Sequence, residues 1–310
     1  MLFLRPFAFV LLLGVMGAFY EVILQVADVA EVDAPQDEQV ALHRHDAELG
    51  WLPRSEPVVF EGADGPLEAR PNTFGLRGAE PDPSRPYRIL VMGGEHVWGA
   101  GVADAERFTD QLAARTPHWD VVNAGVKGYG TDQSLLLARH LVLALRPSAV
   151  LLVFDPMKDR DANQANVSPD GHYKPHFVLD DTTLVLRGQP VPEAVAFRED
   201  DLPDSQLTRL VADAATRLRH PAYIGPDPSE ELLVRFREEV GRVGVSFFVA
   251  LTRPDVRAEQ ALDAAGIAWA HVDAYEGPDY TGWHWTPEGH TVVANRLDGF
   301  LTAYLTDWSE

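Results

Sequence analysis

Residues that could do chemistry follow two of the short apolar runs in the sequence. Glu95 comes after the run 89–92, Lys158 comes after the run 149–154, and His284 lies near the C-terminus. A carboxylate held beside an imidazole can activate water. A carboxylate held beside an ammonium group instead forms an ion pair that withdraws both groups from chemistry. The first arrangement predicts a catalytic site, and the second predicts a site without catalysis.

Apolar runs alternate with segments of helical periodicity after residue 87, which is typical of a parallel sheet covered on both faces. Sites in such sheets form at the carboxyl ends of the strands. Functional residues are therefore expected in the loops after Met92, Val122, Phe154 and Val272. We predict strands at 89–92, 121–122, 149–154, 246–251 and 267–272, helices at 108–114, 132–144, 205–219, 230–240, 256–265 and 286–305, and a hairpin around 180–181.

Composition narrows the possible function classes. The chain has 310 residues, of which 46% are hydrophobic, so a folded core is expected. Its formal net charge of -21 would repel phosphate backbones and anionic lipid headgroups, which argues against nucleic-acid binding. The absence of cysteine excludes disulfides, thiolate metal sites and a cysteine nucleophile. His96 and His284 lack the spacing of metal ligands, so neither a metal nor another cofactor is predicted.

The first residues predict a membrane anchor. Residues 1–20 are apolar except for Arg5, and apolar residues continue to Val26. This is about the roughly 20 residues that cross a bilayer. Arg5 precedes the apolar segment and acidic residues follow it, so the positive-inside rule predicts a cytoplasmic N-terminus and an extracytoplasmic, periplasmic main domain. A cleaved signal peptide is the alternative, although no convincing cleavage site follows. We expect an anchor at 1–27, a juxtamembrane linker and packing segment at 28–87, and one domain at 88–310.

Four segments in order resemble the sequence blocks of a known family. They are RILVMGGEHVWGAGVADAERFTDQLA, VVNAGVKGYGTDQ, LLVFDPMKDRDAN and HWTPEGHTVVANRL. Together they resemble the SGNH/GDSL hydrolases over roughly residues 49–305, and the stretches GWLPRSEP and YKPHFVLDDTTLVLRGQPVP are similar to parts of membrane-anchored members. The resemblance implies a three-layer α/β/α sandwich with a central parallel sheet, related to flavodoxin-like folds. It also implies esterase, lipase or O-acyl-transfer chemistry.

The chain departs from the family's pattern at the positions that carry this chemistry. The resemblance implies a serine nucleophile, an oxyanion site made by a glycine amide and an asparagine, and a histidine oriented by an aspartate three residues earlier. Glu95 stands at the serine position and Lys158 at the asparagine position. The residue three before His284 is Thr281, and Asp279 is five before it. Gly94, Gly128, Asp159 and His284 match the pattern.

These two substitutions predict an ion pair. A carboxylate attacks esters poorly, and its acyl product would be a mixed anhydride. A buried glutamate also needs a neutralising partner. Lysine occurs only at positions 127, 158 and 174, and the first two lie in the family-like blocks. We expect Glu95 and Lys158 to form a salt bridge that plugs the pocket.

Three functions follow from these observations. The first is a degenerate, membrane-anchored hydrolase-like domain without serine-esterase activity, serving as an interaction or structural subunit of an envelope or membrane-protein assembly. The alternative is an altered hydrolase, or an O-acyl esterase or transferase acting on an envelope glycan, in which Glu95 and His284 activate water. The third is a carbohydrate-binding module that reuses the cleft. The partner that Glu95 contacts distinguishes the first two.

Overall fold

The computed structural model describes residues 14–17, 20, 38–181, 183–194, 197, 205–272, 280–281 and 284–305. Among the helices in these ranges, none has the length and apolarity that crossing a bilayer requires. The predicted anchor at 1–27 lies outside the described residues except for 14–17 and residue 20, which are helical.

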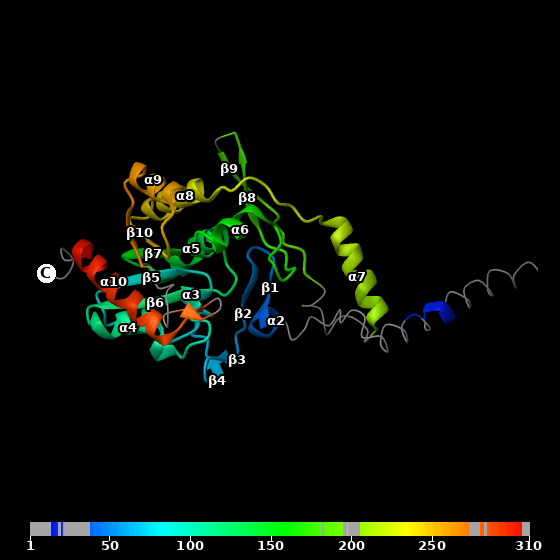
Figure 1. Ribbon diagram of the computed structural model, residues 1–310, viewed down its shortest axis with the longest axis horizontal. Coiled ribbons are helices and arrows are strands. Elements are labelled where there is room, and N and C mark those ends of the chain that lie inside the picture. Colours follow the sequence, from blue (N-terminus) through cyan, green and yellow to red (C-terminus); the bar gives the residue numbers. More distant parts are fainter. Residues whose placement is uncertain are drawn as a thin grey trace, which may run out of the picture.

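A sheet of five parallel strands forms the centre of the domain (Figure 1). Its spatial order is β11-β10-β7-β5-β6, so the first strand of the sheet along the chain lies between the second and the third. This is the strand order of flavodoxin-like folds, whose binding sites lie where the order reverses. Here the reversal lies between β5 and β7. The predicted α/β class with a central parallel sheet is confirmed. The strands are β5 (Tyr87–Gly93), β6 (Trp119–Gly125), β7 (Ala149–Phe154), β10 (Ser246–Leu251) and β11 (Ala268–His271).

Helices cover both faces of the sheet, so its inner strands read as continuous apolar runs. Every residue of β7, with sequence AVLLVF, is buried. One face packs against α5, α8 and α9 through a core that includes Leu136 and Phe236. The other packs against α4 and α10 through a core that includes Phe108 and Leu297. The helices are α3 (Glu95–Trp98), α4 (Phe108–Arg115), α5 (Thr131–Leu145), α6 (Lys158–Gln164), α8 (Ser229–Gly241), α9 (Val256–Ala264) and α10 (Pro287–Leu305), with a 3-10 turn, η1 (Asp104–Glu106).

Part of the segment expected to be linker and packing residues forms two hairpins. Trp51 in the first hairpin is fully buried in the core. Its carbonyl oxygen accepts a hydrogen bond from the Tyr129 hydroxyl at 2.5 Å, and its indole Nε1 donates to the carbonyl oxygen of Lys127 at 3.1 Å. The hairpin therefore supports the loop that follows β6. The elements are α2 (Glu38–Leu42), β1 (His43–Asp46), β2 (Gly50–Pro53), β3 (Val58–Gly62) and β4 (Gly65–Ala69).

An insertion between α6 and α8 contains the predicted hairpin, β8 (His176–Asp180) and β9 (Thr183–Arg187), and the helix α7 (Gln206–Arg219). Lys174, just before the hairpin, is almost fully buried and forms an ion pair with buried Asp132 at the start of α5. Its ammonium also donates to the carbonyl oxygens of Ala162 and Ala165 at 3.0 and 3.1 Å. Lys174 thus holds the insertion, α5 and α6 together. Two short strands, β12 (Tyr280–Thr281) and β13 (His284–Trp285), precede α10.

Replacing Lys174 should strongly destabilise the fold. Lys174→Met leaves the Asp132 carboxylate buried without its cation, and breaking a buried ion pair in this way typically costs about 3 to 5 kcal/mol. Urea unfolding should show this loss in the free energy of unfolding. Adding Asp132→Asn to the variant removes the uncompensated charge and should recover part of the lost free energy of unfolding. A loss below about 1 kcal/mol for Lys174→Met would contradict this role.

Candidate functional site

Glu95 and Lys158 meet at the point where the strand order reverses. Glu95 opens α3 after β5, and Lys158 opens α6 after β7. The carboxyl ends of these two neighbouring strands bring the two residues together, although they are 63 positions apart in the sequence. Lys158 Nζ donates a hydrogen bond to Glu95 Oε1 at 2.6 Å, and the side chains are only 21% and 20% exposed. The ion pair expected from the two substitutions is present.

This ion pair keeps Glu95 in its charged form. Burial pushes the pKa of Glu95 upward, but the charges of Lys158 and His96 outweigh burial and lower the pKa to about 2. A carboxylate with so low a pKa is a weak base and a weak nucleophile at neutral pH. Glu95 is therefore poorly suited to take a proton from water.

A second buried pair lies beside the first. His96 Nε2 lies 3.2 Å from Asp155 Oδ2, and both side chains are buried. Because His96 follows Glu95 and Asp155 follows β7 directly, this pair joins the same two loops as the ion pair. Asp155 was missed in the sequence analysis. Its position immediately after the buried run 149–154 was the signal that could have found it.

Asp159 supports the loop after β7. Its Oδ2 accepts a hydrogen bond from the Asp155 backbone N–H at 2.7 Å. Burial, together with the charge of Asp155, raises the pKa of Asp159 well above its usual range. The matched aspartate therefore acts within the loop that presents Lys158.

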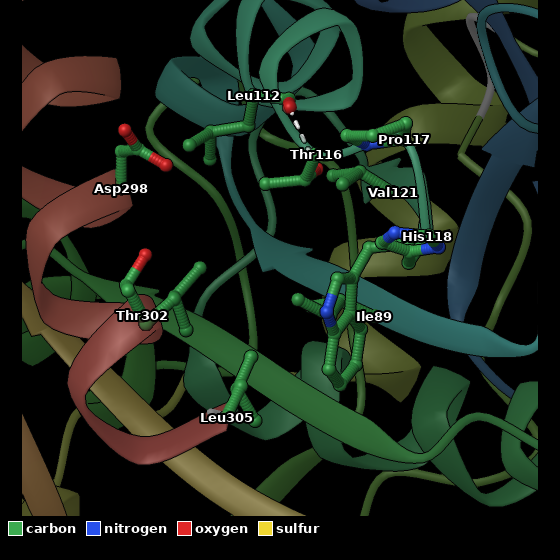
Figure 2. A pocket seen from close by; sticks show the side chains of 11 residues that line it. Ile89, Leu112, Thr116, Pro117, His118, Val121, Asp298, Thr302 and Leu305 are labelled. Atoms are coloured by element: carbon green, nitrogen blue, oxygen red, sulfur yellow. Dashed lines mark hydrogen bonds between the residues drawn. The ribbon is translucent and has the colours of Figure 1, made fainter. Parts of the chain in front are cut away.

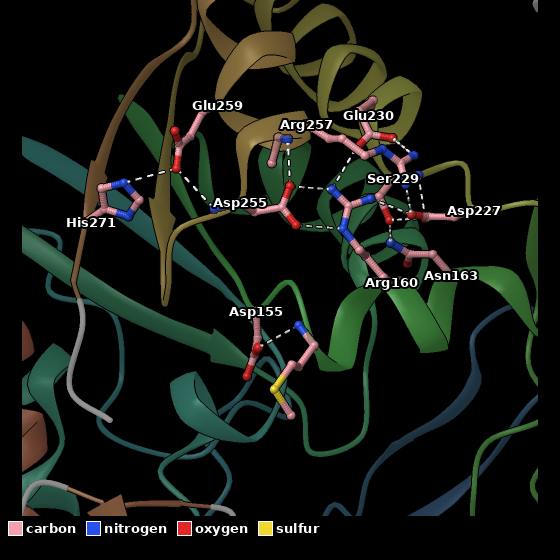
Figure 3. Close-up of polar contacts among 12 residues, drawn as sticks. Asp155, Arg160, Asn163, Asp227, Ser229, Glu230, Asp255, Arg257, Glu259 and His271 are labelled. Carbon is pink, nitrogen blue, oxygen red and sulfur yellow. Dashed lines mark hydrogen bonds and ion pairs between the residues drawn. The ribbon is translucent and has the colours of Figure 1, made fainter. Parts of the chain in front are cut away.

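Arg160, two residues after Lys158, anchors α6 to the helices on one face of the sheet (Figure 3). It donates to both carboxylate oxygens of Asp255 at 2.7 and 2.9 Å and to Glu230 at 2.6 Å, and it also pairs with Asp227. The sequence analysis missed this cluster because its members are 67 to 95 positions from Arg160. These contacts fix the position of the start of α6, and therefore the position of Lys158.

His284 lies next to the ion pair on β13. Burial and the Lys158 charge lower the pKa of its imidazole to about 4, so the ring is neutral at physiological pH. Its buried Nδ1 has no hydrogen-bond partner in the part of the chain that the structure describes. Thr281 is the residue paired with His284 across the β12–β13 ladder, and only its backbone is described. Asp279 lies outside the described residues. The described site thus contains no group that orients the imidazole.

Aromatic contacts connect the last block to the first. Trp285, beside His284, is buried and stacks on the His96 ring with centroids 4.3 Å apart and planes 16° apart. His290 on α10 is also buried, and its Nδ1 accepts a hydrogen bond from the Phe108 backbone N–H at 3.2 Å. Burial lowers the pKa of His290 to about 3. Both residues are part of the packing.

Two glycines allow the loops to approach one another. A Cβ on Gly94 would lie 2.8 Å from the carbonyl oxygen of Tyr129, so only glycine permits this contact between the first and second blocks. Gly128 has φ of +80°, in the left-handed region that favours glycine. The prediction of a tight turn at Gly128 is confirmed. The close approach of the loops and the tight turn explain these two glycines without a catalytic role.

The apolar pocket in Figure 2 lies elsewhere in the fold. It has a volume of about 170 Å³ and is lined by Ile89, Trp119 and Leu305, among others. Ile89 and Trp119 lie near the amino ends of β5 and β6, whereas Glu95 follows the carboxyl end of β5. The pocket and the ion pair therefore lie at opposite ends of the parallel strands. Within the described ranges, no group of three or more histidine and carboxylate side chains could hold a metal ion.

The strand order and the placement of the blocks agree with the resemblance seen in the sequence. The first three blocks contain the loops after β5, β6 and β7, and the last contains β13 and the start of α10. The strand order is the flavodoxin-like one that the resemblance implies.

Comparison with known proteins finds similarity among solved structures. No protein-family model matches the sequence, and no curated protein matches it. The esterase EstA from Pseudoalteromonas sp. is 9% identical with a TM-score of 0.42, over 71% of this chain and 98% of that one. A putative lipolytic protein of the G-D-S-L family from Desulfitobacterium hafniense is 10% identical with a TM-score of 0.39, over 69% and 99%. Est24, a carbohydrate acetylesterase from Sinorhizobium meliloti, is 10% identical with a TM-score of 0.42, over 70% and 99%. Similarity at this level carries no argument about activity.

Removing the charge of Glu95 should change how stability depends on pH. The pKa of Glu95 is about 2 in the folded protein against 4.5 for an unperturbed glutamate. Because the folded-state value is the lower one, the stabilisation of about 3 kcal/mol is present above pH 4.5 and is lost as the pH falls toward 2. Urea unfolding at a series of pH values should therefore show a smaller loss below pH 4.5 for Glu95→Gln than for the wild type.

Glu61→Gln, at an exposed glutamate of β3, provides the matched control and should follow the wild-type pH profile. Parallel profiles for Glu95→Gln and the wild type between pH 5 and pH 2 would contradict the assigned pKa of Glu95.

The ring of His284 should titrate with a midpoint near pH 4 in an NMR experiment, because burial and Lys158 disfavour its charged form. The resonance is assigned by its disappearance in His284→Gln. Lys158→Met removes the neighbouring ammonium and leaves Glu95 charged, so the midpoint should rise. A wild-type midpoint above 6.5 would indicate a carboxylate bonded to the imidazole and would overturn the description of this site.

Proposed function

We propose that this chain is a membrane-tethered, hydrolase-like domain without serine-esterase activity, which serves as an interaction or structural subunit of an assembly in the cell envelope. The observation that carries the proposal is the Glu95–Lys158 ion pair, in which Nζ and Oε1 are 2.6 Å apart. Glu95 occupies the position of the nucleophile and Lys158 that of an oxyanion-binding side chain. The Glu95 carboxylate and the Lys158 ammonium group are therefore bonded to each other.

The state of His284 also supports the absence of esterase chemistry. An esterase histidine must take a proton from the nucleophile, and an orienting carboxylate holds the correct tautomer and stabilises the imidazolium. Burial and, after it, the Lys158 charge lower the pKa of His284 and so oppose the imidazolium. In the described part of the chain, Nδ1 has no hydrogen-bond partner. Proton transfer to His284 is therefore disfavoured.

The altered-hydrolase alternative requires Glu95 to be free to act with His284. The carboxylate is instead bonded to Lys158 and has a pKa of about 2, which makes it a poor base. The structure thus favours the non-catalytic function over the alternative.

The tethered, extracytoplasmic location in this proposal comes from the sequence. Arg5 precedes the apolar segment 1–20 and acidic residues follow it. This charge order directs the chain after the segment across the membrane. The partners that we propose are the membrane itself and other envelope or membrane proteins.

The full-length protein should neither react with a fluorophosphonate probe nor hydrolyse p-nitrophenyl acetate. Ester hydrolysis by the wild type that disappears in His284→Ala would overturn the proposal. Because both proteins are purified in the same way, this pair separates true turnover from a contaminating esterase.

Restoring the family-like residues should restore reactivity. The variant Glu95→Ser, Lys158→Asn and Thr281→Asp removes the ion pair and supplies a nucleophile, an oxyanion donor and an orienting carboxylate. It should react with the fluorophosphonate, and the same variant carrying His284→Ala should not. A folded triple variant that stays unlabelled would contradict the assignment of Glu95 and Lys158 to these positions.

A further inference from the structure

Helix α7 has an apolar face that is exposed toward the C-terminal end of the helix. Leu207, Leu210, Val211, Ala214 and Leu218 are spaced so that they lie on the same side of the helix. Leu218 is 85% exposed and Val211 is 60% exposed. The helix stands apart from the layers of the domain (Figure 1). Since leucine is normally buried, this stripe indicates a binding surface.

Another exposed apolar side chain follows the helix in the sequence. Ile224, which follows α7 by five residues, is 78% exposed. Nothing in the catalytic resemblance accounts for exposed side chains here, because α7 lies in the insertion between α6 and α8. The apolar face of α7 therefore has a role of its own.

The charges of α7 differ in sign from those of the whole protein. The helix carries three arginines and one aspartate, whereas the chain has a net charge of -21. Arg217 and Arg219 lie on either side of Leu218 in the sequence, and the geometry of an α-helix places them on opposite flanks of the apolar stripe. Arginines that flank an apolar face are typical of helices lying in the surface of an anionic membrane.

Acidic residues limit this contact to one half of the helix. Asp200, Asp201 and Asp204 precede α7 in the sequence and would be repelled by anionic lipid. The exposed apolar side chains and the flanking arginines lie toward the C-terminal end. Charge thus favours a shallow contact through the second half of α7.

We propose that the C-terminal half of α7 is a membrane-contact helix, in which Val211 and Leu218 enter the headgroup region of an anionic bilayer while Arg219 binds its charged lipids; Arg217 pairs with Asp213 on the same helix. This contact would hold the domain against the membrane and would orient the plugged site relative to the bilayer. It would act whether or not that site has any activity.

The absence of cysteine allows a direct test in the full-length chain. Single variants Leu218→Cys, on the apolar face, and Thr216→Cys, on the opposite face, are labelled with the polarity-sensitive fluorophore NBD. Each protein is reconstituted with vesicles of phosphatidylcholine and phosphatidylglycerol. The label at position 218 should shift to shorter wavelength, become protected from iodide and be quenched by nitroxide-bearing lipid. The label at position 216 should remain accessible to iodide.

Vesicle flotation measures whether the chain as a whole is attached, so a failed anchor can be distinguished from a helix that does not dock. Two results would overturn the proposal. In the first, the chain floats with the vesicles but the label at 218 is as accessible as the label at 216. In the second, the label at 218 is already protected without lipid, which would indicate protein rather than a bilayer on this face.

Charge variants separate lipid binding from simple apolar insertion. Combined with the label at 218, Arg219→Gln should weaken docking about fivefold, the value expected from about 1 kcal/mol per basic residue near an anionic surface. Arg219→Lys keeps the charge and should dock as the wild type does. Equal docking of both variants on these vesicles would contradict a role for Arg219 in binding anionic lipid.

Discussion

The structure of the site depends on neutralising one negative charge at the reversal of strand order. Glu95 stands where two neighbouring strands direct their loops toward the same point, and a carboxylate there is stable only with a cation beside it. Lys158 supplies that cation. The His96–Asp155 pair joins the same loops and is buried more deeply. In many α/β folds, substrate binds where the strand order reverses. Here two side-chain pairs, Glu95–Lys158 and His96–Asp155, join the loops at that point.

These two pairs are held in place by interactions on both sides. Arg160 attaches the start of α6 to three carboxylates from the loops and helices of the adjoining layer. Lys174 attaches the other end of α6 to the insertion and to α5. Trp285 packs on His96, so the last block is held against the first. The family-like blocks therefore remain in mutual contact.

The residues that match the family's pattern differ in role from those that depart from it. Glycines at positions 94 and 128 and buried aromatic residues such as Trp285 serve loop geometry and packing, which the domain needs in any case. Glu95 and Lys158 stand where the resemblance implies a nucleophile and an oxyanion donor, and there the chain differs from the family's pattern. A surface function is consistent with this pattern, and α7 provides an exposed surface far from the sheet reversal (Figure 1).

The sequence by itself determined the local elements, because apolar runs and helical periodicity report the burial of nearby residues. The strands at 149–154 and 246–251 match the observed bounds, and the helix predicted at 132–144 is observed at Thr131–Leu145. The Glu95–Lys158 contact was also predictable, since the resemblance placed both residues in loops that meet. Only the tertiary structure decided the hairpins at 43–69, the His96–Asp155 pair and the carboxylates around Arg160. Their partners come from distant segments, and no local spacing records which side chains will face each other once the layers pack.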